Sequence, residues 1–297
     1  MKSRKVIIVH GGAGKRRTGI ISARKGVIRA VETGHQRLKE GGSAVEAVCA
    51  AVVALEDNPV FNAGIGSSLN LAGFVEMDAS IMDDKMRYGA VAAIREVKNP
   101  ILVARKVMEE TDHIILAGEG AVRFAQHFDF ETTDLITKRR KRQWLSYRDK
   151  IKTGKGHRYF QKVRRYLGYL DTVGAVALDS HGRLAAATSS GGILLRLPGR
   201  VGDSAIIGGG TYCNKIGAVS TTGHGEEIAK LLLARYAVAN LSRYCAEEAA
   251  RRTIRLAYKA NCLCGLIVLK RSGGFATGEN TGYLAWAAIK DGELFHF

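Results

Sequence analysis

The stretch that decides the fold is Asp171-Thr-Val-Gly-Ala-Val-Ala-Leu-Asp-Ser-His-Gly-Arg-Leu-Ala-Ala-Ala-Thr188. Residues 172–178 and 184–188 are short runs rich in the apolar and β-branched side chains that favour strands. The four residues between them, Asp179-Ser-His-Gly182, are typical of a tight turn. The stretch therefore predicts a β-hairpin that begins at Thr172.

Strand pairs and helices continue outward from this hairpin in both directions. The spacing of apolar residues and the turn signals predict strands at 6–9, 74–81, 87–94, 262–269 and 283–289. Helices are expected at 21–38, from the Ser43-Ala-Val-Glu46 capping box to about Leu55, after Asn99-Pro100 with Asn99 as N-cap, at 226–239 and at 246–260. Hairpins followed by helix pairs in both halves predict an α+β fold in which helices cover antiparallel sheets.

A glycine cluster, His10-Gly-Gly-Ala-Gly14, follows the first expected strand. It is not a phosphate-binding loop, because Arg16 stands where that motif needs Ser or Thr and Val9 stands where it needs its first glycine. We interpret the cluster as a tight turn that needs positive φ.

The net charge of +17 is concentrated in one segment. Residues 138–165 hold thirteen Lys or Arg against one acid, Asp149, so this segment carries +12 of the total. Trp144, Tyr147, Tyr159 and Phe160 are interleaved with the basic residues, which would suit an RNA-binding arm. We favour the simpler interpretation that the segment is a solvated linker, and we expect no nucleic-acid partner.

The remaining composition excludes several classes of protein. No apolar run reaches the roughly 20 residues needed to cross a bilayer. The basic N-terminus passes at once into a strand-like run and glycines, unlike a signal peptide, so we expect a cytoplasmic protein. The irregular spacing of the cysteines predicts buried free thiols; they are Cys49, Cys213, Cys245, Cys262 and Cys264. The G-x-S-x-G and H-E-x-x-H motifs of many hydrolases are absent from the sequence.

Loops in the second half bring together residues suited to an amino-acid substrate. Arg200 and Asp203 lie three residues apart between glycines. A guanidinium binds a carboxylate with two hydrogen bonds, and a carboxylate can hold an ammonium group. The pair could therefore clasp a free α-amino acid or form an ion pair on a surface loop, and spacing alone does not decide. Thr222-Gly223 likewise suits an oxyanion hole, or an N-cap ahead of Glu226.

Seven motifs follow one another along nearly the whole chain. They are Val9-His-Gly-Gly-Ala-Gly14, Gly42-Ser-Ala-Val-Glu-Ala47, Asn62-Ala-Gly-Ile-Gly-Ser67, Asp171-Thr-Val-Gly-Ala-Val176, Ala187-Thr-Ser-Ser-Gly-Gly192, Gly199-Arg-Val-Gly-Asp-Ser204 and Thr222-Gly-His-Gly-Glu226. In this order they resemble the plant-type L-asparaginase/isoaspartyl peptidase family of N-terminal nucleophile (Ntn) hydrolases. The resemblance implies a single domain over 1–297, an αββα four-layer sandwich.

Members of this family are made as an inactive precursor that cuts itself before a threonine. The resemblance puts the cut between Asp171 and Thr172, which gives an α chain of residues 1–171 and a β chain of residues 172–297. The basic segment becomes a processing linker, and two αβ units are expected to form a heterotetramer. Cleavage frees the amine of Thr172, and an α-amino group with a pKa of ~7.7–8.0 can act as general base for the threonine's own hydroxyl.

The resemblance also assigns the groups around the nucleophile. Ser190 stands where the family usually has a second threonine, and it keeps the hydroxyl. Thr222 and Gly223 are expected to form the oxyanion hole, and Asn62 to lie near Thr172.

Substrate binding is assigned in the same way. Arg200 is expected to bind the substrate α-carboxylate, while Asp203 and the Gly225 carbonyl hold its α-ammonium. The segment 55–65 resembles a loop that holds a structural sodium ion through backbone carbonyls, and no other cofactor is expected. The sodium ligands would be Leu55, Glu56, Phe61, Ala63 and Ile65.

The expected activity is hydrolysis of β-aspartyl amide bonds by the Thr172 nucleophile. The implied substrates are L-asparagine, which yields aspartate and ammonia, and β-aspartyl peptides. Two alternatives remain at this point. One is a glycosylasparaginase-like hydrolase, and the other is a nucleic-acid-binding protein that uses 138–165 on an inactive scaffold.

Overall fold

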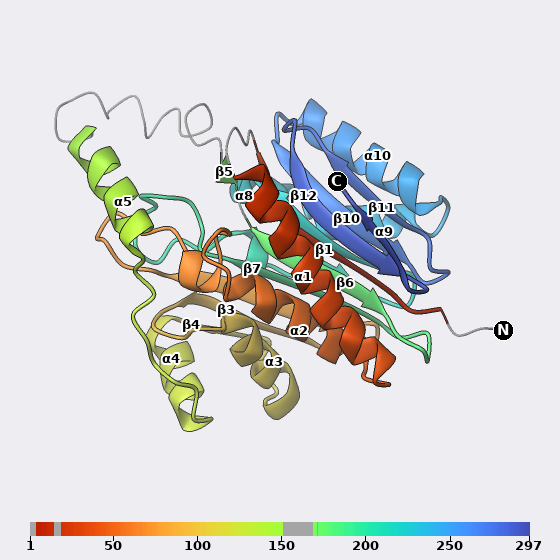
Figure 1. Cartoon of the computed structure of the whole chain (residues 1–297), viewed down its shortest axis with the longest axis horizontal. Helices are drawn as coiled ribbons and strands as arrows, with labels where there is room; N and C mark the ends of the chain where they lie inside the picture. The colour runs from red at the N-terminus through yellow and green to blue at the C-terminus, as the bar shows by residue number, and fades with distance from the viewer. Residues whose placement is uncertain (1–3, 15–18, 151–168, 171) are drawn as a thin grey trace.

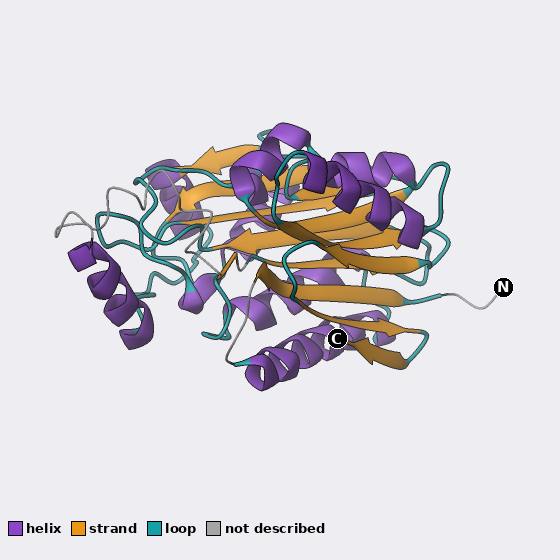
Figure 2. Cartoon of the chain, turned by 90° about the horizontal axis from the view of Figure 1, so that it is seen from above, coloured by secondary structure: helices purple, strands orange, loops and turns teal. Residues whose placement is uncertain are grey.

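The computed structural model describes residues 4–14, 19–150, 169–170 and 172–297. In this part of the chain two β-sheets pack face to face, and helices cover the outer face of each (Figure 1). Figure 2 shows the same layers from above, with helices on both sides of the strands. The expected α+β class and its αββα order are confirmed.

The larger sheet contains nine described strands. They are β1 (Val6–Gly14), β2 (Met77–Asp83), β3 (Tyr88–Ile94), β4 (Ile115–Ala117), β5 (Tyr169–Leu170), β6 (Val173–Leu178), β7 (Leu184–Ser190), β12 (Leu284–Lys290) and β13 (Glu293–His296). Their order is β13-β12-β1-β6-β7-β2-β3-β4, and β5 pairs with β1. Neighbouring strands are antiparallel apart from the parallel pair β3 and β4.

The smaller sheet contains four described strands, all antiparallel. They are β8 (Thr211–Cys213), β9 (Gly217–Gly223), β10 (Cys264–Lys270) and β11 (Phe275–Glu279), in the order β11-β10-β9-β8. Its inner face packs against the larger sheet, so the two sheets enclose one apolar layer.

The helices form the outer layers. Those of the first half are α1 (Ile20–Lys39), α2 (Ala44–Glu56), α3 (Pro100–Glu110), α4 (Gly118–His127) and α5 (Lys138–Lys150). Those of the second half are α8 (Gly225–Leu231), α9 (Leu233–Asn240) and α10 (Ala246–Lys259). Helices α1, α2 and α3 cover the larger sheet, and α9 and α10 cover the smaller one.

The side-chain pattern of β1 explains why the larger sheet is buried on both faces. Alternate side chains of a strand point to opposite faces. Ile7 and Val9 therefore pack beneath the helices, while Val6 and Ile8 pack between the two sheets. A strand that is apolar on both faces is typical of a sheet buried in this way.

Two local predictions are confirmed in detail. β6 and β7 pair as the hairpin expected around Asp179, whose carboxylate accepts hydrogen bonds from the backbone of His181 and Arg183. The capping box of α2 is present, with the Ser43 hydroxyl accepting from the Glu46 amide and Glu46 accepting from the Ser43 amide.

The glycine cluster after Val9 is strand rather than the expected turn. β1 continues through Gly14, with an irregularity in its pairing to β12 between His10 and Ala13. Gly12 has a φ of 103°, which a glycine adopts without strain. The glycines thus allow a bulge inside a long strand, a feature that local composition does not distinguish from a turn.

Two helix predictions need correction. The Asn99 side chain does not cap α3 but donates to the carboxylates of Glu56 and Asp57. The helix expected at 226–239 is divided into α8 and α9 by Leu232, whose φ is 46°. Tertiary contacts therefore override the local signal at both positions.

The basic segment is not simply a solvated linker. Its described part, residues 138–150, forms α5, which contacts the rest of the protein through Arg140 and Trp144. Residues 151–168 and Asp171 lie outside the described residues, and so do Tyr159 and Phe160 of the expected RNA-binding arm. The division into chains 1–171 and 172–297 therefore stays a prediction.

Two further sequence predictions can be checked. The five cysteines are free thiols, and all are buried apart from Cys245. Within the described ranges, no helix is long and apolar enough to span a membrane.

Candidate active site

Thr172 lies directly before β6, at one end of the layer between the two sheets. Because side chains alternate along a strand, Thr172 shares a face with Val176, which packs between the sheets. The residue is only 5% exposed. The hydroxyl expected to act as nucleophile is therefore held in a nearly enclosed position.

Two hydroxyls from other strands flank Thr172. Its Oγ1 donates to the Oγ of Ser190 at 3.1 Å, and its backbone nitrogen donates to the Oγ1 of Thr222 at 3.3 Å. Pairing of Val173 with Ser189 brings the end of β7 beside Thr172, and β9 delivers Thr222 from the smaller sheet. The structure thus brings together three expected site residues, one from each of three segments.

Besides its expected place in the oxyanion hole, Thr222 contacts the backbone nitrogen of Thr172. Its hydroxyl faces the very nitrogen that cleavage would convert into an amine, so it can orient that group. Gly223 ends β9 with a φ of 145°, and a Cβ there would lie 2.6 Å from Cys264 Cα. Glycine is therefore required where the chain turns toward α8.

Asn62 fixes the turn that follows Ser190. Its Nδ2 donates to the Gly192 carbonyl at 2.7 Å, and its own carbonyl accepts from the Gly191 amide at 2.7 Å. Its Oδ1 accepts from the Ser68 amide, also at 2.7 Å. Since the Gly192 amide in turn donates to Ser190 Oγ at 3.0 Å, Asn62 helps to position the hydroxyl that contacts Thr172.

A buried polar pair lies behind the nucleophile. His10 Nε2 and Ser220 Oγ are 2.8 Å apart, and Ser220 also contacts Thr188 at 2.7 Å. Burial lowers the pKa of His10 to about 3, although the backbone of Thr172 partly opposes the shift, so the imidazole is neutral at physiological pH. A Cβ at Gly174 would collide with Ser220 Oγ and lie 2.5 Å from His10 Nε2, which explains the glycine there.

Arg200, Asp203 and Gly225 form a second cluster. A Cβ at Gly225 would lie 2.8 Å from both Arg200 Nη2 and Asp203 Oδ1, so this glycine leaves room between the two charged groups. Asp78 links the two clusters, since its backbone pairs with Ser190 and its carboxylate accepts from the Gly202 amide at 2.7 Å. The expected amino-acid clasp is therefore connected to Ser190 through Asp78, and substrate binding by Arg200 and Asp203 stays a prediction.

The Arg200 guanidinium forms an ion pair with the Glu226 carboxylate in the structure. Arg200 Nε donates to Glu226 Oε1 at 2.9 Å, and Nη2 lies 2.8 Å from Oε2. This two-point contact is the one that a substrate carboxylate would make. The side chain of Glu226 is 44% exposed and that of Arg200 is 16% exposed, so Glu226 is the more solvent-accessible partner of the pair.

Burial also changes the charge of the clasp. It raises the pKa of Asp203 to about 7, with the Arg200 guanidinium opposing the shift. Asp78 and Glu226 add to the rise because like charges disfavour another carboxylate. Asp203 therefore titrates near neutrality while no ammonium group is bound.

Two carbonyl oxygens of the expected sodium loop lie close to glycines. A Cβ at Gly64 would collide with the Glu56 carbonyl, and one at Gly66 would collide with the Phe61 carbonyl. Backbone carbonyls suit a hard cation such as sodium. Leu55 and Glu56 end α2, and Phe61, Ala63 and Ile65 follow in this loop. Sodium binding by the carbonyls of these five residues stays a prediction.

Sequence reasoning missed His10, Asp78 and Glu226. His10 has its partner Ser220 at a separation of 210 residues, and Asp78 reaches Gly202 across 124 residues. The available signals were the position of His10 in the buried strand β1 and the position of Glu226 directly after Gly225. Neither signal identifies a partner so far away in the sequence. Asp171, the expected cleavage residue, lies outside the described residues.

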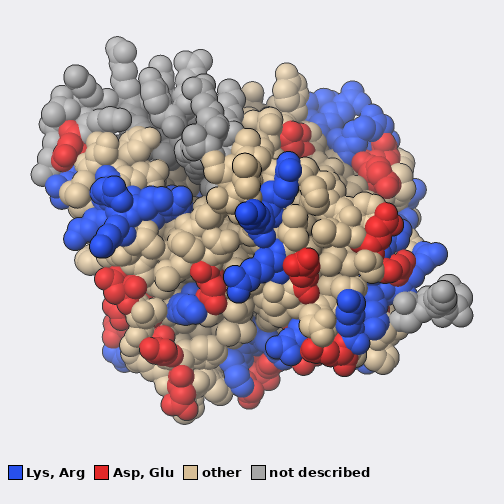
Figure 3. Space-filling view, in the orientation of Figure 1, with Lys and Arg blue, Asp and Glu red and all other residues tan. Residues whose placement is uncertain are grey.

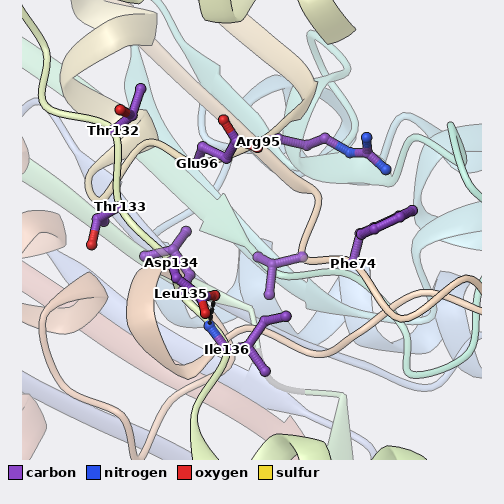
Figure 4. A pocket seen from close by; sticks show the side chains of 9 residues that line it. Phe74, Arg95, Glu96, Thr132, Thr133, Asp134, Leu135 and Ile136 are labelled. Atoms are coloured by element: carbon purple, nitrogen blue, oxygen red, sulfur yellow. Dashed lines mark hydrogen bonds between the residues drawn. The ribbon is translucent and has the colours of Figure 1, made fainter.

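A separate cavity of about 390 Å³ lies near Phe74 and Arg95 (Figure 4). The Arg95 guanidinium lies 4.3 Å from the centre of the Phe74 ring, and its Nε is 3.6 Å from Glu76. The remaining lining comes from Val75, Glu96 and residues 132–136. None of the expected site residues lines this cavity, so it is not the clasp beside Thr172.

Comparison with known proteins gives whole-chain matches. A family model described as Asparaginase (Asparaginase_2) matches residues 3–297. The chain is 47% identical over 298 residues to a plant-type L-asparaginase of Thermococcus kodakarensis, covering 96% of both chains. It is 44% identical over 297 residues to an isoaspartyl peptidase/L-asparaginase of Xenopus laevis (97% and 93% covered). It is also 45% identical over 307 residues to the Homo sapiens protein of that name (98% and 95% covered).

Proposed function

The chain belongs to the asparaginase family Asparaginase_2, and from this premise we propose that Thr172 is the nucleophile with which it hydrolyses β-aspartyl amides. The protein is a hydrolase with asparaginase and isoaspartyl peptidase activity. The observation that carries the residue assignment is the enclosed contact of Thr172 with Ser190 and Thr222, with the clasp of Arg200 and Asp203 alongside.

Self-cleavage prepares the nucleophile. The Oγ1 of Thr172 attacks the Asp171 carbonyl, the bond to the Thr172 nitrogen breaks, and this nitrogen takes the hydroxyl proton. Water then hydrolyses the resulting ester, which leaves a carboxylate on Asp171 and a free amine and hydroxyl on Thr172. The uncut chain has only an amide nitrogen at this position, and an amide cannot serve as a base.

The free amine then supports turnover. It accepts the proton of Thr172 Oγ1 as the oxygen attacks the side-chain carbonyl of the substrate. Thr222 and the Gly223 amide stabilise the oxyanion, while Ser190 holds the attacking oxygen in place. The leaving ammonia or amine takes the proton, and water hydrolyses the acyl-enzyme to release aspartate.

The clasp selects the substrate class. Arg200 binds the α-carboxylate, while Asp203 and the Gly225 carbonyl hold the α-ammonium. L-asparagine and β-aspartyl peptides carry both groups on the same carbon, one methylene from the scissile carbonyl. One site therefore serves both substrates, and the leaving group lies outside the clasp.

We infer three further properties from the family. Two αβ units form a heterotetramer, and sodium binds the carbonyls of the 55–65 loop to stiffen it without taking part in chemistry. The protein works in the cytoplasm, where the five free thiols remain reduced.

The test of the function combines a gel, a terminal sequence and an assay. The purified protein is expected to give two fragments on a denaturing gel, a second N-terminus that begins at Thr172, and ammonia from L-asparagine. Aspartate release from a β-aspartyl dipeptide tests the second activity. An intact chain that releases no aspartate but forms a salt-sensitive RNA complex would refute the hydrolase and support the nucleic-acid alternative.

The Michaelis constant is expected to rise as the pH falls below 7. Asp203 attracts the substrate ammonium only when its carboxyl group is ionised. The pKa of Asp203 is about 7, so the ionised fraction of this carboxyl group decreases below this pH. A simple titration gives about a fivefold higher KM at pH 6 than at pH 7, with a plateau above pH 8. Steady-state kinetics from pH 6 to 8 measures this. Asp203→Asn should give a high KM that does not change with pH, and a flat wild-type KM would contradict the assignment.

A further inference from the structure

Helix α5 presents two different faces. Arg140, Gln143, Trp144 and Tyr147 have the spacing of one helix face and are buried or half-buried. Lys138, Lys141 and Arg142 are exposed on the other side. Figure 3 shows Lys and Arg gathered where α5 lies in Figure 1. The basic helix is thus docked through one face, although its composition suggested a solvated linker.

The docked face binds the backbone of one loop, residues 57–75. Arg140 Nε donates to the Gly66 carbonyl at 2.6 Å, and Trp144 Nε1 donates to the Asn70 carbonyl at 2.8 Å. Arg139 Nη2 adds a contact to the Pro59 carbonyl at 2.6 Å. Arg140 is 6% exposed, and burial of a guanidinium is costly unless its donors are satisfied. These contacts therefore specify how the helix and the loop fit together.

The Trp144 ring adds shape to this contact. It packs at the edge of the apolar core beneath α1 and α2. A Cβ at Gly73 would lie 3.1 Å from the ring, and Gly73 has a φ of 89°. The loop is thus shaped to receive the indole, because a side chain at Gly73 would crowd the ring.

The same loop leads directly to the nucleophile. It carries Asn62, whose carbonyl and amide group hold Gly191 and Gly192 at 2.7 Å each. The Ser68 and Leu69 carbonyls accept from Arg196 and from the Leu195 amide, so the loop is bound along the whole turn after β7. This turn begins with Ser190, whose hydroxyl contacts Thr172. Hydrogen bonds at both ends of the loop, joined by the loop backbone, therefore connect α5 to Thr172.

We propose that Arg140 and Trp144 are positioning residues: helix α5 stays docked after cleavage and holds the loop 57–75, so that Asn62 and Ser190 keep the Thr172 hydroxyl in its attacking position. Helix α5 is then part of the mature enzyme's machinery and not only a spacer before the cut. The inference rests on the proposed function for its kinetic readout, while its structural readout is independent.

The kinetic test uses processed enzyme, counted by its new Thr172 terminus. Arg140→Ala is expected to lower kcat about tenfold with little change in KM, because a misplacement of about 1 Å costs on the order of a hundredfold and the loop should loosen only partly. Arg140→Lys should recover part of the loss, and Trp144→Phe, which removes the N–H donor but keeps a ring, should lower kcat by a smaller factor. Arg142→Ala is the matched control, since Arg142 is exposed and donates within α5 to Lys138, and it should behave as wild type.

Hydrogen exchange of the processed proteins supplies the second readout. Amides of residues 58–75 should exchange faster in Arg140→Ala than in wild type or Arg142→Ala. Unchanged kcat in both Arg140→Ala and Trp144→Phe, or a lower kcat without faster exchange in the loop, would overturn the proposal. If Arg140→Ala fails to self-process, the comparison of Trp144→Phe and Arg140→Lys with wild type decides.

The two proposals fail in distinguishable ways. A wild-type protein that releases neither ammonia from L-asparagine nor aspartate from a β-aspartyl dipeptide refutes the proposed function. Hydrogen exchange of the loop in Arg140→Ala then tests the docking of α5 alone. An active wild type with an unaffected Arg140→Ala variant refutes only the positioning role.

Discussion

We expect Thr172→Ala to remain one intact chain of 32.1 kDa and to release no ammonia from L-asparagine. The substitution removes the oxygen that attacks both the Asp171 carbonyl and the substrate, so processing and turnover are lost together. Removal of a nucleophile from an acyl-transfer site lowers the rate by about 10⁴-fold or more. A denaturing gel and an ammonia assay on the same preparation measure both effects.

A matched variant separates loss of chemistry from loss of fold. Thr172→Ser keeps the hydroxyl and removes one methyl group, so it should self-process and retain part of the activity. Both variants should remain folded, because each removes at most two heavy atoms from the Thr172 side chain. Normal cleavage of Thr172→Ala would contradict the assignment of the nucleophile.

Arg200→Ala is expected to self-process normally but to lose about 100-fold in kcat/KM, mainly through a higher KM. The Arg200 side chain is 16% exposed, and truncation of one partner of a buried charge pair costs about 2–5 kcal/mol. The loss also removes the cation that opposes the raised pKa of Asp203, so the ammonium side of the clasp weakens too. Steady-state kinetics on processed enzyme checks the magnitude.

Two comparisons make this result specific. Arg123→Ala removes an exposed arginine paired with Glu119 and should leave kinetics and stability almost unchanged. Glu226→Gln removes the carboxylate that now occupies Arg200, so its KM should not rise as it does in Arg200→Ala. Equal kinetic constants for Arg200→Ala and wild type would exclude Arg200 from the site.

Much of the fold follows from local patterns that act over a few residues. The hairpin around Asp179 and the capping box at Ser43 depend on neighbours within four positions, and both form as expected. The two faces of β1 follow from strict alternation of side chains. Local signals failed where a distant partner competed for the same group, as when Asn99 turned to Glu56 and Asp57.

The expected site was also predicted only in part from the sequence. The ordered motifs predicted Thr172, Ser190, Arg200, Asp203 and Thr222 as site residues, and the structure brings these residues into two neighbouring clusters. The motifs could not show that Glu226 occupies Arg200, because that contact depends on where α8 begins. Nor could composition show that the basic segment turns Arg140 and Trp144 inward.

The sequence by itself determined most of the longer elements, the family and the chemical types expected in the site, because periodicity, caps and motifs are properties of adjacent residues. The tertiary structure alone decided which hydroxyl faces which atom, how His10 meets Ser220 and what α5 binds. The physical reason is that strand register and helix docking depend on burial and hydrogen-bond satisfaction over the whole molecule, and a local stretch carries no record of partners 50 to 210 residues away.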